Sequence, residues 1–286
     1  DRSQEFESGL FPGTEAIDFA AAQLTQQYDD KNGGFGSAPK FPSPHNLMFL
    51  LRQWNHTKEN RFKDAVEATL TSMRLGGIWD HVGFGFHRYS TDAQWLLPHF
   101  EKMLYDQALL MMAYTEGYQV CQNPLFKQTI EEISEYVSRE LTDPSGAFYS
   151  AEDADTEGEE GKFYVWSEQE IDSILSTEDA VWFKDVYRFR SEGNFEDEAT
   201  KELTGNNIPH LKKALSSTEE LRFKDIRASL FEVRNNRAKP LLDDKVLTDW
   251  NALMIAALAK AGAVLQNSTY LDAAEKSFQF LEKNLI

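Results

Sequence analysis

The sequence is poor in cysteine and has no long apolar run. Its 286 residues include a single cysteine, Cys121, so no intrachain disulfide can form, which fits a reducing, cytoplasmic environment. No apolar run approaches the roughly 18 residues that a transmembrane helix needs. The start, DRSQEFESGL, is polar and acidic and lacks the segments of a signal peptide. We therefore expect no membrane span and no secretory leader.

Basic residues are also scarce. Lys and Arg number 29 against 47 Asp and Glu, which gives a formal net charge of −18. A field of this sign excludes general electrostatic binding to nucleic acid or to an anionic membrane. Hydrophobic residues make up 41% and aromatic residues 13% of the chain, which is typical of a folded globular protein.

Most sequence motifs that are typical of a particular catalytic reaction are also missing. There is no GxSxG, HExxH, CxxC or P-loop pattern. The six histidines are scattered, and the spacing of His81, His87 and His99 is not that of a metal site. We expect no metal and no cofactor.

What the sequence does have is helical periodicity. Apolar residues recur at steps of three and four over most of the chain, and few segments alternate as strands do. The predicted helices cover 14–28, 44–54, 60–75, 98–121, 124–141, 167–175, 178–187, 218–235, 248–265 and 268–284. A small strand hairpin is predicted from 148–155 and 161–166. These patterns predict an all-α fold.

The predicted helices form pairs, and the pairs repeat. The segment ALLMMAYTEGYQVCQNPLFKQTIEEISEYV from Ala108 matches ALMIAALAKAGAVLQNSTYLDAAEKSFQFL from Ala252 at a constant offset of 144 residues. Each is an apolar helix, a Gln-Asn turn, an aromatic residue and an amphipathic helix. The segment from Leu47 has the same outline. Such pairs must stack to bury their apolar faces.

Loops in which glycine precedes an aromatic residue follow these pairs. We expect the glycines to stop the helices in the left-handed conformation, and Trp79, Phe84 and Phe86 to seal the hairpin ends. This pattern predicts an (α/α)6 toroid, in which inner helices surround a funnel; an α-solenoid arc is the alternative. Seven or eight long helices are fewer than the twelve of a full toroid, so we expect an incomplete one. Residues 1–12 are a polar lead-in, 13–286 form the toroid, and 142–245 contain an insertion.

The stretch WDHVGFGFHRY, residues 79–89, is the first candidate for chemistry. Its rings and glycines have a structural explanation as a hairpin seal. Asp80, His81, His87 and Arg88 do not, because a seal needs no charged groups. We therefore assign these four residues to the floor of the funnel.

The segment WLLPHFEKMLYDQ, residues 95–107, is the second candidate. A helix starting at Pro98 would place His99, Lys102 and Asp106 on one face, with Glu101 beside them. The N-terminus of a helix favours anions or oxygen-rich ligands. The alternative is a solvent-exposed face with a Lys102–Asp106 pair.

Two further segments carry polar candidates. In SAEDADTEGEEGK, residues 150–162, Asp153 and Asp155 can act as general acid or base, although a solvated acidic turn is the alternative. An EF-hand is excluded because its twelfth position is Tyr164. In DKVLTDWNALM, residues 244–254, Thr248 suits an N-cap, and Trp250 and Asn251 suit stacking and hydrogen bonding to a sugar ring.

The longest motifs resemble a known family. They are GGFGSAPKFP, GGIWDHVGFGFHRYSTDAQWLLPHFEKMLYDQ, DADTEGEEGKFYVW, GNFEDE followed by TGNNIP, and DDKVLTDWNALMIAALA. Over about residues 13–286 the chain is similar to the spermatogenesis-associated protein 20 family of thioredoxin-domain-containing proteins. The resemblance implies an (α/α)6 toroid similar to N-acylglucosamine 2-epimerases and six-hairpin glycosidases. It also implies a thioredoxin-like domain in cis in full-length relatives. That domain and its cysteine motif are absent here, so no redox activity carries over.

Two classes of function follow. The first is a carbohydrate-active enzyme whose ligand is a sugar or sugar phosphate. Epimerisation or isomerisation would use His87 and His99 as acid and base, and glycoside hydrolysis would use two carboxylates from Asp80, Asp153 and Asp155. The expected ligand contacts are Arg88, His81, Glu101, Lys102, Asp106, Trp79, Trp250 and Asn251. The second class is a non-catalytic helical module that binds a peptide or sugar, or docks a redox domain.

Overall fold

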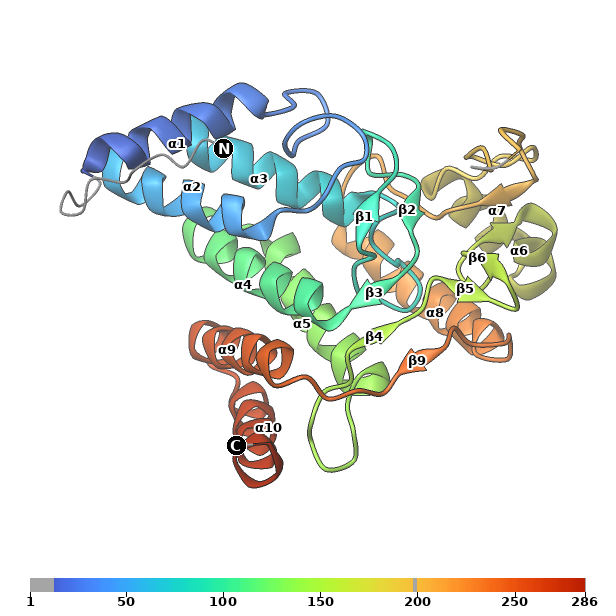
Figure 1. Cartoon of the computed structure of the whole chain (residues 1–286). Coiled ribbons are helices and arrows are strands. Elements are labelled where there is room, and N and C mark those ends of the chain that lie inside the picture. Colours follow the sequence, from blue (N-terminus) through green and yellow to red (C-terminus); the bar gives the residue numbers. More distant parts are fainter. Residues whose placement is uncertain (1–12, 198–199, 286) are drawn as a thin grey trace, which may run out of the picture.

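The computed structural model describes residues 13–197 and 200–285 (Figure 1). The lead-in predicted for residues 1–12 lies outside the described residues. The helices within the described ranges are α1 Thr14–Gln27, α2 Pro44–Thr57, α3 Asn60–Leu75, α4 Leu104–Cys121, α5 Pro124–Glu140, α6 Glu168–Ile174, α7 Thr177–Val186, α8 Ser217–Arg234, α9 Thr248–Leu265 and α10 Ser268–Asn284. The all-α prediction is confirmed.

The predicted repeat is present in the helices themselves. Both ends of α9 lie 144 residues after those of α4, and both ends of α10 lie 144 residues after those of α5. The Gln-Asn turns also match. Gln122 and Gln266 end their helices in the left-handed conformation, at φ 53° and 54°. Asn123 and Asn267 then cap the next helix, because each side chain accepts a hydrogen bond from a backbone N–H two residues on.

The long helices form two layers. Helices α2, α4 and α9 pack side by side, and their N-terminal ends face the short strands (Figure 1). Helices α3, α5 and α10 each pack against a member of this row. The sequences of α4 and α9 are apolar on nearly all sides, as expected of helices enclosed by neighbours. Because all three helices begin at the same end of the row, side chains from three hairpins lie near one another at that end.

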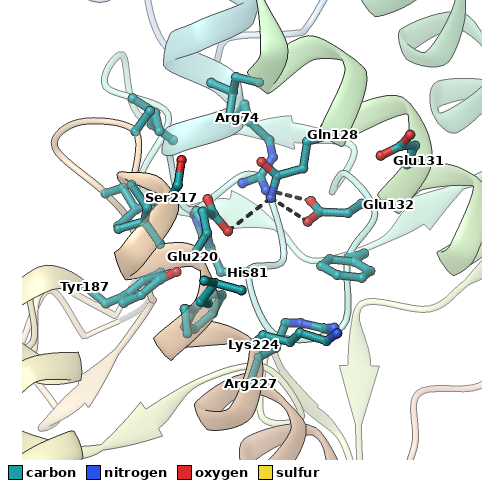
Figure 2. A pocket seen from close by; sticks show the side chains of 18 of the residues that line it. Arg74, His81, Gln128, Glu131, Glu132, Tyr187, Ser217, Glu220, Lys224 and Arg227 are labelled. Carbon is teal, nitrogen blue, oxygen red and sulfur yellow. Dashed lines mark hydrogen bonds and ion pairs between the residues drawn. The ribbon is translucent and has the colours of Figure 1, made fainter. Parts of the chain in front are cut away.

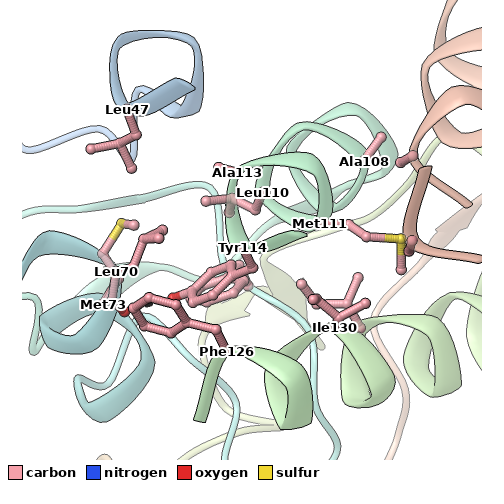
Figure 3. Close-up of a cluster of buried hydrophobic side chains, with 14 of the residues drawn as sticks. Leu47, Leu70, Met73, Ala108, Leu110, Met111, Ala113, Tyr114, Phe126 and Ile130 are labelled. Atoms are coloured by element: carbon pink, nitrogen blue, oxygen red, sulfur yellow. Dashed lines mark hydrogen bonds between the residues drawn. The ribbon is translucent and has the colours of Figure 1, made fainter. Parts of the chain in front are cut away.

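The core lies between the two layers. Leu47 of α2, Leu70 of α3, Met111 of α4 and Ile130 of α5 all belong to one cluster of buried apolar residues (Figure 3). Tyr114 of α4 is fully buried in this cluster, and its hydroxyl donates a hydrogen bond of 2.7 Å to the Leu70 carbonyl. The polar atom of the ring is therefore satisfied inside the core.

The strands within the described ranges are two residues long, and β3 leads directly into α4. They are β1 Tyr89–Ser90, β2 Pro98–His99, β3 Lys102–Met103, β4 Ala151–Glu152, β5 Asp155–Thr156, β6 Glu159–Glu160, β7 Trp166–Ser167, β8 Asn206–Asn207 and β9 Leu242–Asp243. The antiparallel sheets are β1–β2, β3–β4–β9, β5–β6 and β7–β8. The hairpin predicted from 148–155 and 161–166 is wrong in its pairing, because β4 pairs with β3 and β9 while the hairpin is β5–β6.

The predicted start of the fourth long helix is also wrong. Residues 98–103 are extended, and α4 begins at Leu104. Strand pairing keeps these residues extended, because β2 pairs with β1 and β3 pairs with β4. The Leu104 N–H also bonds the Ser150 carbonyl. His99, Lys102 and Asp106 therefore do not share a helical face. Similarly, Thr248 is the first residue of α9 and not its N-cap, a position held by Leu247.

The glycine-aromatic loops are confirmed as seals, with one correction. Trp79, Phe84 and Phe86 are buried; Trp79 stacks on Phe84 at 6.0 Å and makes an edge contact with Phe86 at 4.7 Å. Gly76, however, follows α3 with φ −73° and is not left-handed. Glycine is required there for space, because a Cβ atom would lie 2.4 Å from the Trp95 carbonyl oxygen.

The region between α5 and α9 has a core of its own. Phe183 and Tyr187 from the α7 end and Phe223 of α8 form its aromatic centre, with Trp166 and Ile171 beside them. None of the helices within the described ranges is long and apolar enough to cross a membrane.

Candidate functional site

Arg88, Glu101 and Tyr105 meet at the N-terminal end of α4. The Arg88 guanidinium donates a hydrogen bond of 2.8 Å to Oε2 of Glu101 and another to the Tyr105 hydroxyl. The Arg88 backbone N–H also bonds the Glu101 carbonyl at 2.9 Å. All three side chains are partly exposed to solvent. They form an ordered, charged group at the N-terminal end of the helix row.

Asp106 lies in the first turn of α4, next to this pair. It is 8% exposed, and its Oδ2 atom has no hydrogen-bond partner among the described residues. Burial raises the pKa of the carboxyl to about 8; the charge of Glu101 adds to this effect, and that of Arg88 opposes it. Asp106 is therefore protonated at neutral pH and can donate a proton.

His99 lies at the edge of the same group. Its Nδ1 atom is 2.7 Å from Oε1 of Glu160, and its Nε2 atom is 3.6 Å from Oε2 of Glu101. The hydrogen bond with Glu160 raises the pKa of His99. The acidic segment 150–162 thus reaches this group through Glu160, which β5–β6 presents.

Aromatic rings flank the charged group on two sides. On one side, Tyr89 lies 4.8 Å from the ring of Phe41 and 5.1 Å from that of His99. On the other side, Trp250 at the start of α9 makes an edge contact of 4.8 Å with Tyr105. Rings beside polar groups suit a ligand with both apolar faces and hydroxyl groups.

Asp80 lies elsewhere, inside a buried ion cluster. Its oxygens accept two hydrogen bonds from Arg234, at 2.8 and 2.9 Å, and one from Lys102, at 2.8 Å. The backbone N–H groups of Val82 and Gly83 also bond Oδ1. Burial alone would raise the pKa of Asp80, but Arg234 and Lys102 hold it well below its usual range. The Asp80 carboxylate and the Lys102 amine are both buried, and neither belongs to the exposed group at the N-terminal end of the helix row.

The structure does not bring the predicted histidines together. The His87 ring bonds the Phe100 carbonyl through Nδ1 at 2.8 Å, and the His81 ring bonds the Gly76 carbonyl through Nε2 at 3.0 Å. Burial lowers the pKa of both rings to about 3, so both are neutral. Within the described residues, no three His, Cys, Asp or Glu side chains form a group that could hold a metal.

The remaining predicted residues divide between surface and core. Asp153 and Asp155 are exposed, and Oδ1 of Asp153 accepts a bond from the Asp155 backbone. Asn251 is fully buried, and its amide bonds both the N–H and the carbonyl of Phe148. Trp79 is buried under the Arg74 guanidinium. Asn251 and Trp79 therefore hold the fold together and are not open to a ligand.

We call Arg88, His99, Glu101, Tyr105, Asp106 and Trp250, with Glu160 on His99, the α4-mouth site. Tyr105 and Glu160 were not among the predicted site residues. Tyr105 stands directly before Asp106 in the sequence, which is the one signal that pointed to it. Nothing local marked Glu160, because its contact with His99 spans 61 residues.

No protein-family model matches the chain. Spermatogenesis-associated protein 20 of Homo sapiens is 38% identical to it over 295 residues, covering 92% of this chain and 37% of the human protein. An uncharacterised protein of Caenorhabditis elegans is 34% identical over 291 residues, covering 90% of this chain and 40% of that protein. The chain thus spans well under half the length of these relatives. Among solved structures, a family 76 α-mannanase of Bacteroides thetaiotaomicron superposes with a TM-score of 0.51 at 12% identity, over 94% of this chain and 57% of the mannanase.

Proposed function

Because the chain belongs to the spermatogenesis-associated protein 20 family over the region it shares with the human protein, and because that region has the fold of an α-mannanase, we propose that it is a carbohydrate-active enzyme. Its substrate would bind at the α4-mouth site. The likeness to the mannanase shows the fold, so the chemistry must be argued from the side chains.

One observation carries the proposal. Asp106 combines a buried carboxyl, an oxygen without a partner in the described residues and a pKa of about 8. Beside it, Glu101 is held in an ion pair with Arg88 at 2.8 Å. One carboxyl group buried without a partner and a second held by a guanidinium have different environments, and acid–base catalysis by two carboxyl groups depends on such a difference.

Glycoside hydrolysis is the reaction that this pair supports best. The protonated Asp106 would donate its proton to the glycosidic oxygen as the bond to the leaving sugar breaks. The negative charge of Glu101, oriented by Arg88, would stabilise the positive charge that develops on the sugar ring, or activate the incoming water. Trp250 and Tyr105 would stack on the sugar faces.

Epimerisation or isomerisation of a sugar is the second candidate. His99 favours it, since Glu160 orients the ring through Nδ1 and leaves Nε2 directed toward Glu101. In this reaction His99 would remove a proton next to a carbonyl and Asp106 would supply one. We assign no role to His87, because its ring is buried and its Nδ1 atom bonds the Phe100 carbonyl.

A substrate panel tests the proposal. Mannosides and other glycosides would be assayed for new reducing ends, and free aldoses and ketoses for inversion or isomerisation by NMR. Asp106→Asn should reduce turnover by about 10²–10⁴-fold, the usual contribution of a general acid. Asp225→Asn makes the same substitution at an exposed position on α8 and should leave turnover unchanged.

Turnover that survives in Asp106→Asn would refute the assignment of the acid. Saturable sugar binding without turnover of any compound would favour the non-catalytic module instead.

A further inference from the structure

A cavity lies on the outer side of the molecule, and none of the residues of the α4-mouth site line it. It is enclosed by α3, α5 and α8 and has a volume of about 610 Å³, within the usual range for small-molecule sites. Its polar lining includes Arg74, His81, Gln128, Glu132, Tyr187 and Glu220 (Figure 2). We call it the α5–α8 cavity. Its apolar wall comes from leucine and phenylalanine side chains such as Leu215 and Phe223.

Two buried groups in the lining have hydrogen-bonding capacity to spare. Arg74 is 5% exposed, and its Nε atom has no partner among the described residues. The neutral His81 ring donates from Nε2 to the Gly76 carbonyl, so its Nδ1 atom is an acceptor. Its ring packs edge-on against Tyr187, which lines the same cavity. Buried polar groups of this kind call for an explanation, and a ligand is one.

The charges at one end of the cavity do not balance. Glu132 of α5 is paired with Arg74 at 2.6 Å, and Gln128 bridges it to Glu220 of α8 at 3.0 and 3.2 Å. Glu132 therefore has an ion-pair partner, whereas Glu220 has none among the described residues and is bonded by the Gln128 amide. Burial is the largest effect on Glu220 and raises its pKa; Arg74, the Gln128 hydrogen bond and Arg227 oppose this rise, and the charge of Glu132 adds to it.

The other charged residues that line the cavity do not form an ion pair with Glu220. Glu131 and Glu135 also line the cavity, but each has an ion-pair partner on α5, Lys127 at 3.8 Å and Arg139 at 3.3 Å. Lys224 and Arg227 lie toward the opposite end of the cavity (Figure 2). The Arg227 guanidinium is held over the Phe84 ring at 4.3 Å. An anion near Arg74 would meet Glu132 and Glu220, so the acidic end favours a cation.

We propose that the α5–α8 cavity binds a small organic amine, with the ammonium group against the Glu220 carboxylate and the apolar part against Leu215 and Phe223. A half-buried carboxylate gains most from a cation that also fills the apolar space beside it. The site uses none of the residues of the α4-mouth site, so it stands independently of the proposed reaction.

The test uses three probes of one shape and different charge: phenethylamine, 2-phenylethanol and phenylacetate. Binding to the whole chain is measured by calorimetry near physiological salt, which screens the general attraction of a protein of charge −18. Phenethylamine should bind saturably and more tightly than 2-phenylethanol, and phenylacetate should bind least. Glu220→Gln should raise the Kd of phenethylamine by about 10-fold or more, the value of one charged hydrogen bond.

Asp225→Asn is the matched control, since it removes one negative charge from an exposed position of the same helix. Its Kd should stay within about twofold of the wild type. Thermal unfolding of both variants checks that the fold is retained. The proposal is overturned if phenethylamine shows no saturable binding up to about 10 mM. It is equally overturned if phenylacetate binds as tightly, or if the two variants weaken binding alike.

Discussion

Replacing Asp106 with asparagine should stabilise the protein while removing its proposed acid. The folded pKa of about 8 lies above the value of ~3.9 expected in the unfolded chain. Between these values the folded state holds a proton that the unfolded state releases, so the free energy of unfolding falls as pH rises from about 4 to about 8. At 1.36 kcal/mol per pH unit, this linkage costs about 4 kcal/mol at pH 7.

Asparagine keeps the shape of the side chain but has no proton to lose. The variant should therefore match the wild type near pH 4 and exceed it progressively toward pH 8. Urea unfolding of both proteins at several pH values measures this difference directly, and other titrating groups cancel in the comparison. Asp225→Asn, at an exposed position, should show no such trend. A variant that is less stable than the wild type at pH 8, or a difference that does not change with pH, would refute the burial argument.

Three further perturbations have definite expected outcomes. Asp80→Asn leaves a buried lysine and a buried arginine without their anion, which should cost about 3–5 kcal/mol of unfolding free energy and a clearly lower Tm; an unchanged Tm would contradict this. Gly83→Ala would place a Cβ atom 1.8 Å from Nη2 of Arg234 and should cost about 1–3 kcal/mol, checked by urea unfolding. Glu160→Gln should lower the pKa of His99, measured by NMR titration of the ring protons, and an unshifted titration would disprove the pairing.

Helices and their pairing could be predicted because they depend on local periodicity and on a repeat. The shared offset of 144 residues and the Gln-Asn turns of α4–α5 and α9–α10 are properties of short segments. The start of α4 could not be predicted in this way. The sequence from Pro98 is compatible with a helix, but pairing with Tyr89–Ser90 and Ala151–Glu152 makes residues 98–103 extended.

The candidate site was predicted in part. Arg88 was singled out in the 79–89 loop, and Glu101 and Asp106 in the 95–107 segment; the structure places these three side chains near one another. Asp80 looked equally functional in the sequence. Its partner Arg234 lies 154 residues away, and no local pattern reveals that such a charge is already neutralised.

The polar residues of WDHVGFGFHRY also lie in different environments, which no local sequence pattern predicts. Within one loop, Arg88 faces the α4-mouth site, His81 lines the α5–α8 cavity, and His87 is enclosed in the core. The loop passes between the α4-mouth site and the α5–α8 cavity, so residues that are close in sequence face different parts of the molecule. Only the packing of distant elements decides which residue faces which.

The most direct test of the central claim is the pH dependence of turnover on the best substrate of the panel. If Asp106 is the acid, activity should fall at high pH with an apparent pKa near 8, the value that burial gives this carboxyl. Asp106→Asn should lose that limb together with about 10²–10⁴-fold of the rate. A wild-type profile that is flat across pH 7–9, or an Asp106→Asn variant that keeps the full rate, would contradict the account.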